Sequence, residues 1–205
     1  MTTKPILFSS PMVRAILEGR KTVTRRPVKP RRDWEIGESK DGSPWPYFRP
    51  YVYAEPEPIE VPSPYSVGDL LWVRETWAAA DMMYQNHELD VPRVIAYRAD
   101  HSAIDQGLSR QVPIPDWDTA SWNWDAFRWR PSIHMPRWAS RITLEVTSVT
   151  VERVQDINDE DAIAEGAESI GHFCDLWDSL YGDDSPYSLG RNPWVWRVAF
   201  RRVQP

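Results

Sequence analysis

The 205-residue sequence has one cysteine, no long hydrophobic run and only four histidines, and each scarcity excludes a class of protein. The single Cys174 cannot form a disulfide within the chain, which favours a reducing, cytoplasmic setting. No segment approaches the roughly 20 apolar residues of a transmembrane helix, and residues 1–12 lack the apolar core of an export signal, so we expect neither insertion nor export. Scattered histidines give no metal-ligand spacing, and no glycine-rich phosphate loop is present. We therefore expect no metal and no cofactor.

The overall charge restricts the possible partners. A net charge of −6 argues against a protein that coats nucleic acid non-specifically. It leaves room for a local basic pocket, because recognition depends on where charges lie. The 41% hydrophobic content is enough for a core, and the length favours one domain spanning residues 1–205.

Tryptophan and proline are both in excess, with 12 and 19 residues. Together they indicate a loop-rich domain whose loops are held by aromatic packing. Nine prolines lie between Pro27 and Pro64, which predicts an irregular insertion over about 27–64. Clustered tryptophans indicate a second irregular insertion over about 101–130.

Periodicity and capping residues predict an α+β protein. Ser10, Pro11 and Gly19 have the positions of an N-cap, a first helical residue and a C-terminal glycine. Asn158 and Gly166 similarly bound a short helix, and apolar spacing predicts another from Phe173 to Tyr181. The expected strands are 5–10, 22–26, 71–74, 93–100, two strands from Ile142 to Val151 with a bulge or turn near Thr147, and 194–203. Short strands interrupted by few helices predict a small mixed β-barrel with helices at its mouth.

The segment EGRKTVTRRP, residues 18–27, holds four cations and two threonines between positions 20 and 26. Strand alternation places Thr22, Thr24 and Arg26 on one face. Lys21 lies in the preceding turn, from which its long side chain can reach that face. This layout is typical of a small pocket, although a solvated turn after a helix is the ordinary alternative.

Several ordered motifs resemble those of the ASCH-domain family, especially its longer branch common in phages and prophages. The motifs are SSPMVRAILEGRKTVTRR, VGDLLWVRETW, YRAD, WRPSIHMPRWASRITLEV and INDEDAIAEGA. The resemblance implies a PUA-like β-barrel with flanking helices and a cleft between them. The wider superfamily often binds RNA. One small member of the family removes acetate from 4-acetylcytidine, and others have been described as ribonucleases.

The resemblance also implies three catalytic residues. The Gly-Arg-Lys-Thr-x-Thr motif of the small amidohydrolase corresponds to Lys21 and Thr24, and the glutamate after its later helix corresponds to Glu165. Amide hydrolysis needs a nucleophile, a base and an acid for the leaving amine. Thr24 would attack or position a water, Lys21 would be the base when neutral, and Glu165 the acid/base partner. Solvated or ordinary structural roles remain the alternatives for all three.

Six further residues are candidates for substrate binding. Arg25 and Arg26 would lower the pKa of Lys21, and Arg26 would also bind an oxyanion or phosphate. Glu75 is a second possible acid, although an ion pair with Arg74 is the favoured explanation. The other candidates are His134 in an ordered loop, and Trp77 and Trp138, which are suited to stacking on a base.

The sequence thus favours a nucleoside- or RNA-recognising ASCH-type protein, leaning towards hydrolysis of a modified base such as that of 4-acetylcytidine. The alternatives are a ribonuclease using Lys21, Arg26 and His134, a non-catalytic RNA-binding module, and a phage-derived interaction or morphogenesis protein. The acidic net charge favours a small nucleoside over a long polyanion.

Overall fold

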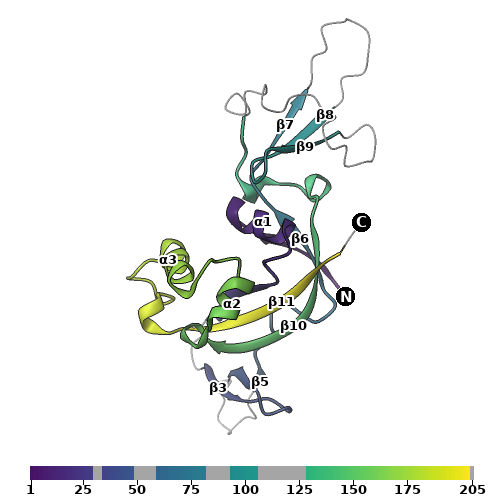
Figure 1. Cartoon of the computed structure of the whole chain (residues 1–205). Helices are drawn as coiled ribbons and strands as arrows, with labels where there is room; N and C mark the ends of the chain where they lie inside the picture. Colours follow the sequence, from purple (N-terminus) through teal and green to yellow (C-terminus); the bar gives the residue numbers. More distant parts are fainter. Residues whose placement is uncertain (30–33, 49–58, 82–92, 106–127, 204–205) are drawn as a thin grey trace, which may run out of the picture.

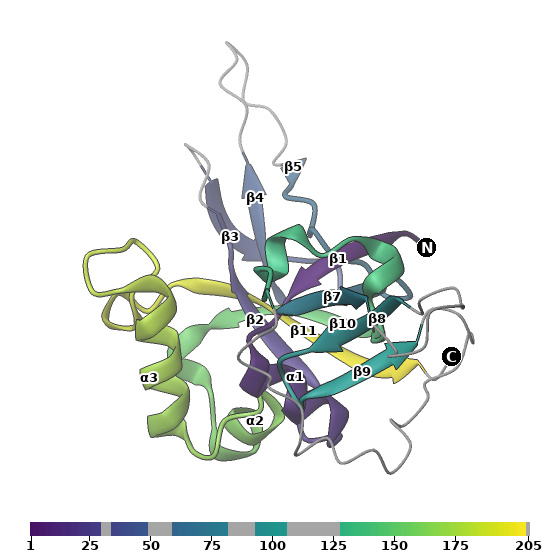
Figure 2. The ribbon, with the colours of Figure 1, turned by 90° about the horizontal axis from the view of Figure 1, so that it is seen from above.

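The computed structural model describes residues 1–29, 34–48, 59–81, 93–105 and 128–203. Its centre is a five-stranded sheet in the order β1-β6-β10-β11-β2 (Figures 1 and 2). β1 and β6 are parallel, and the other neighbours are antiparallel. The strands are β1 (Thr3–Leu7), β2 (Val23–Pro27), β6 (Leu70–Arg74), β10 (Thr143–Arg153) and β11 (Trp194–Val203).

β10 and β11 form the long curved pair that dominates Figure 1. The sequence predicted two strands here, because the apolar residues change parity between Val146 and Val149. The structure has a single strand whose register shifts between Val146 and Ser148. A β-bulge of this kind bends the strand and moves later side chains to the opposite face. The bulge alternative is therefore correct and the prediction of two strands is wrong.

The predicted α+β class is confirmed, whereas the described strands form no closed barrel. β1 and β2 are the two edges of the main sheet and are not paired with each other. Helix α1 (Ser10–Leu17) connects them instead, and it places Val13 and Ile16 in the core with Leu144 and Val198. A helix between the edges takes the place of the ladder that would close a barrel.

The first two α-helices of the described chain have the end signals that the sequence predicted, with one shift, and the third was predicted from apolar spacing alone. α1 has Ser9 rather than Ser10 as its N-cap. α2 (Asp159–Ala164) begins where Asn158 accepts a 2.8 Å hydrogen bond from the Asp161 amide, and Gly166 follows with φ +85°. α3 (Ile170–Tyr181) buries Phe173 and Trp177 in a second core that also contains Val154, Ile157, Ala162, Ala167 and Val195.

The first insertion contains a small sheet, so its predicted irregularity is wrong for the described residues. β3 (Trp34–Glu38), β4 (Pro44–Phe48) and β5 (Ile59–Glu60) are antiparallel. Pro44 and Pro46 cannot donate to a ladder, which concealed β4 in the sequence. Trp45 joins this sheet to the main one, because its ring packs edge-on against Trp196 with centroids 5.0 Å apart.

A third sheet contains β7 (Trp77–Asp81), β8 (Arg93–Tyr97) and β9 (Ser102–Asp105). β9 lies within the second predicted insertion, whose residues 106–127 are outside the described part of the chain. Short 3₁₀ helices complete the structure: η3 (Ser132–His134), η4 (Arg137–Ala139), η5 (Val154–Asp156) and η6 (Leu189–Arg191). Among the described residues, no helix is long and apolar enough to cross a membrane.

Candidate functional site

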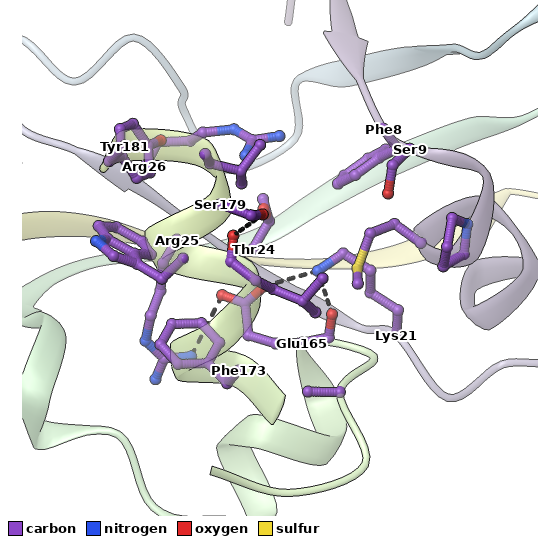
Figure 3. Close-up of a pocket in the computed structure, with 16 residues that line it drawn as sticks. Phe8, Ser9, Lys21, Thr24, Arg25, Arg26, Glu165, Phe173, Ser179 and Tyr181 are labelled. Carbon is purple, nitrogen blue, oxygen red and sulfur yellow. Dashed lines mark hydrogen bonds and ion pairs between the residues drawn. The ribbon is translucent and has the colours of Figure 1, made fainter. Parts of the chain in front are cut away.

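A cavity of about 300 Å³ lies between β2 and helix α3 (Figure 3). This volume is at the lower end of the range for small-molecule sites. One wall comes from Phe8 and the start of α1, and the opposite wall from the inward face of α3. The turn before β2, β2 itself and the end of α2 contribute the charged groups and one threonine: Lys21, Thr24, Arg25, Arg26 and Glu165.

Lys21 is buried and uses all three of its ammonium donors. Its Nζ lies 2.6 Å from Glu165 Oε2, 2.6 Å from the Glu165 carbonyl oxygen and 2.8 Å from the Val23 carbonyl oxygen. Burial is the largest influence and lowers the pKa of Lys21; Glu165 opposes this, and Arg26 and Arg25 lower it further. The net shift is downward, so the neutral amine is more accessible than in an exposed lysine.

Arg25 fixes the carboxylates around this pair. Its guanidinium lies 2.6 Å from Asp161 Oδ2, 2.7 Å (Nε) from Glu152 Oε1 and 3.4 Å from Glu165 Oε1. Burial alone would lower the pKa of Arg25, but the charges of Glu152, Glu165 and Asp161 raise it overall. Arg25 was predicted to bind substrate; although it lines the cavity, its donors are directed at protein carboxylates. It is best described as the group that orients Glu165.

Thr24 is 2% exposed and lines the cavity, with Lys21 and Glu165 beside it in Figure 3. Among the described residues its hydroxyl has no hydrogen-bond partner. The hydroxyl oxygen itself is not fully buried, because it has accessible surface at the cavity wall. Thr22, which alternation placed on the same face, is exposed at the start of the strand and does not line the cavity.

Arg26 lies at the cavity rim beside Tyr181 (Figure 3). Its Nη2 donates to the Leu7 carbonyl oxygen at 3.0 Å, and its guanidinium stands 5.5 Å from the centre of the Phe8 ring. Lys21 Nζ is 5.4 Å from the same ring centre. Burial raises the pKa of Tyr181, and the nearby Arg26 partly offsets that effect. The cations of Lys21 and Arg26 thus both lie beside the Phe8 ring.

Gly166 allows α2 to end directly against the motif that carries Lys21. Its φ of +85° reverses the chain after Glu165, the C-cap of α2. A Cβ at this position would lie 2.9 Å from Ala15 Cβ and 3.3 Å from Lys21 Cβ. The Thr22 amide also donates to the Ala164 carbonyl at 2.8 Å. The close approach explains how Glu165 reaches a residue far away in the sequence.

Glu75 belongs to a different buried cluster. It is 1% exposed, and its two carboxylate oxygens each accept a 2.9 Å hydrogen bond from Arg141. Arg141 also binds Asp100 and stands 4.0 Å from the centre of the Tyr97 ring. Burial raises the pKa of Glu75, although Arg141 opposes that shift. The structure confirms that Glu75 forms an ion pair, but the partner is Arg141 rather than the predicted Arg74.

The remaining three candidates do not line the cavity either. Trp77 is 2% exposed and packs edge-on against Trp138, with ring centroids 5.9 Å apart. Trp138 is 60% exposed, and His134 is exposed on η3. Stacking of a base on Trp77 is excluded by its burial. Trp138 and His134 lie on the surface near the third sheet.

The aromatic walls of the cavity and the carboxylates that bind Arg25 were not predicted from the sequence. Phe173, Trp177 and Tyr181 were recognised as an apolar stripe, but nothing local indicated that part of the stripe faces a cavity. Glu152 and Asp161 meet Arg25 across 127 and 136 residues. The acidic first turn of α2 was the available signal for Asp161. Within the described part of the chain, no group of His, Cys, Asp and Glu could hold a metal ion.

No protein-family model, curated protein or solved structure matches this chain. The ASCH resemblance therefore depends on the motifs alone and stays a prediction.

Proposed function

We propose that this protein is an ASCH-type, PUA-like hydrolase that cleaves an amide on a modified nucleobase bound in the cavity. The observation that carries the proposal is the buried contact of 2.6 Å between Lys21 Nζ and Glu165 Oε2 beside the unpartnered hydroxyl of Thr24. A base, an acid and a hydroxyl nucleophile are the three groups that amide hydrolysis requires. The cavity size and its aromatic walls suit a planar ring.

The reaction begins with proton transfer within the buried pair. Lys21 passes one proton to Glu165, giving a neutral amine and a carboxylic acid; a poorly solvated environment favours this neutral state. The Thr24 hydroxyl then attacks the carbonyl carbon of the substrate amide, and its proton goes to the Lys21 amine. Glu165 gives its proton to the leaving amine as the C–N bond breaks. The products of this half are an acyl ester on Thr24 and the free amine.

Water completes the cycle. The Glu165 carboxylate takes a proton from the water, the hydroxide oxygen attacks the ester carbonyl, and the C–O bond to Thr24 breaks. Lys21 returns a proton to the Thr24 oxygen. The sum is one amide and one water converted to a carboxylic acid and an amine. Arg26, at the rim, has donors free to hold an oxyanion or a phosphate of the substrate.

The second candidate function is a binding module that holds RNA or a nucleoside without turnover. Its supporting observation is that all three donors of the Lys21 ammonium already have acceptors, which stabilises a resting ion pair. A ribonuclease is less favoured, because its required His134 does not line the cavity with Lys21 and Arg26.

A substrate panel separates these functions. The full chain is incubated with free acylated nucleosides and with single-stranded RNA, and the products are identified by mass spectrometry. Release of cytidine and acetate from 4-acetylcytidine supports the hydrolase, and shortened RNA supports the nuclease. Salt-sensitive binding without any product supports the binding module. The Lys21→Ala, Thr24→Ala and Glu165→Ala variants should each lose the hydrolytic product while staying folded.

A further inference from the structure

A second cavity of about 480 Å³ adjoins the first one. It lies where the end of β2 meets the chain segment before β6 and the loop after α3. Its walls are formed by prolines and rings, with Tyr65, Tyr187 and Trp196 among them. A volume of this size is well within the range of small-molecule sites. Nothing in the proposed reaction uses this space.

The two cavities share a wall. Arg26 and Tyr181 line both of them, and the close-up of the first cavity shows the two side chains next to each other (Figure 3). A ligand that fills both cavities must therefore cross the position of these two residues. We call the position of Arg26 and Tyr181 between the two cavities the crossing. The part of the ligand that lies there would be the part that Arg26 contacts.

The crossing carries positive charge without a compensating acid. Within the described part of the chain, no carboxylate contacts Arg26 or Lys29, and none of the residues that line the second cavity is acidic. The neighbouring cations differ from Arg26 and Lys29 in their partners, because Lys21, Arg25 and Arg197 are all paired with carboxylates. Arg26 donates to the Leu7 carbonyl and contacts the Tyr181 side chain, which fixes the guanidinium and leaves further donors for an anion. Phosphate and carboxylate are the anions that arginine recognises through paired N–H groups, and phosphate is the one that a nucleotide supplies.

The far side of the second cavity presents aromatic rings. Tyr65 and Tyr187 are half-buried, so part of each ring remains accessible. Trp196 is buried against Trp45 and supports this wall without offering a face for stacking. Accessible rings beside a cation are the arrangement by which proteins bind single-stranded nucleic acid, because every base has a face that can stack.

We propose that the second cavity binds the nucleotide next to the one whose base enters the first cavity, with the intervening phosphate held by Arg26 and Lys29. The substrate is then a phosphodiester-linked, single-stranded oligonucleotide rather than a free nucleoside. This inference rests on the proposed function, because it takes the first cavity to be the site of the reacting base. It also replaces the expectation, drawn from the acidic net charge, of a small nucleoside.

The test compares affinities by isothermal titration calorimetry in a Thr24→Val background, which prevents turnover. The probes are 4-acetylcytidine, its 3′- and 5′-monophosphates, and dinucleotides with the acetylated residue at either end. One dinucleotide should bind at least about tenfold more tightly than the nucleoside, the effect of a charge-assisted contact. Lys29→Ala should remove most of that gain. Tyr65→Leu should weaken binding of the dinucleotide and leave the affinity for the monophosphates unchanged.

Lys40→Ala is the matched control, because Lys40 is an exposed lysine in the β3–β4 turn and lines neither cavity. It should keep the full gain. Equal affinities for nucleoside and dinucleotides would overturn the inference, and so would a gain that Lys29→Ala preserves. If a monophosphate binds as tightly as the dinucleotide, the second cavity binds a phosphate but not a second base, and the inference is contradicted.

The outcomes also distinguish this inference from the proposed function. If the unmodified chain hydrolyses 4-acetylcytidine but dinucleotides gain nothing, only the inference fails. If dinucleotides bind through Lys29 and no amide is cleaved, only the hydrolase proposal fails. If none of the probes binds, both are contradicted.

Discussion

Lys21 Nζ and Glu165 Oε2 lie 2.6 Å apart in the protein interior, although 144 residues separate them in the sequence. The contact joins the turn before β2 to the end of α2. It is stabilised from the other side by Arg25, which binds Glu165 and two further carboxylates. A buried pair of this kind is costly to break and serves as a proton-exchanging unit, so its consequences can be measured in stability and in activity.

Removing one member of the pair should destabilise the fold. Lys21→Met leaves the buried Glu165 carboxylate with Arg25 as its one remaining cation among the described residues, and we expect the free energy of unfolding to fall by about 3 kcal/mol. The double variant Lys21→Met/Glu165→Gln should be more stable than the sum of the single changes predicts, because neither charge remains uncompensated. Urea denaturation measures the free energy of unfolding of Lys21→Met, Glu165→Gln and the double variant.

Arg201→Met provides the comparison for these variants. Arg201 is 71% exposed and pairs with Glu145 on the surface, so its loss should cost at most about 1 kcal/mol. Strict additivity of the two changes in the Lys21–Glu165 pair would contradict the coupling.

The pH dependence of activity should report the proton that Lys21 and Glu165 share. The reaction starts from a pair that holds one proton, so kcat/KM should fall as the pH rises through the pKa of Lys21, which burial lowers from 10.5. Stability should instead rise with pH between the folded-state pKa and 10.5, because the unfolded chain holds more protons in that interval. Stopped assays over a pH series and urea titrations measure the two trends.

Arg26→Gln tests whether Lys21 is the titrating group, because the Arg26 charge lowers the pKa of Lys21. The midpoint of the pH–activity profile should move to higher pH in this variant. Arg20→Gln is the control: Arg20 is exposed, pairs with Glu18 and is not among the main influences on the pKa of Lys21. An unchanged midpoint in Arg26→Gln would show that a group other than Lys21 is titrating.

The sequence predicted local features well and distant contacts poorly. Asn158 and Gly166 were recognised as helix ends because capping depends on residues within one turn. The partners of Arg25 could not be found in this way, since they lie on a different strand and helix. Glu75 was assigned to its neighbour Arg74, yet adjacent residues of an extended chain point to opposite faces. The resemblance, rather than periodicity, brought Lys21, Thr24 and Glu165 together.

Gly166→Ala should impair the site as well as the fold. An added Cβ would contact Ala15 and Lys21 at less than normal separation, and φ is in the left-handed region, so both packing and backbone oppose the change. We expect a loss of more than about 1 kcal/mol in unfolding free energy. Turnover should fall further, because Lys21 is displaced.

Gly19→Ala separates the two effects. Gly19 has a similar φ of +76°, but a Cβ there meets nothing within 4 Å. This variant should show the backbone cost alone and retain turnover. If the two alanine variants are indistinguishable in stability and activity, the close approach of α2 to Lys21 is unimportant.

Glu75→Gln should lower stability and spare the chemistry. The substitution keeps the shape of the side chain but removes the charge that two Arg141 donors contact. Thermal unfolding should therefore shift downward while the rate of amide hydrolysis stays close to that of the unmodified chain. A large loss of kcat with unchanged stability would restore Glu75 as a catalytic candidate.

The role of the Thr24 hydroxyl can be measured by the turnover of 4-acetylcytidine by three forms of the full chain, followed by mass spectrometry of the nucleoside. Thr24→Val removes the cavity-facing hydroxyl while keeping the side-chain shape, and Thr22→Val makes the same change at the exposed threonine of the motif. Cytidine and acetate should form with the unmodified chain and with Thr22→Val, and the rate should fall at least about a hundredfold in Thr24→Val. Absence of product in all three forms, or equal rates in all three, would rule out hydrolysis by the Thr24 hydroxyl.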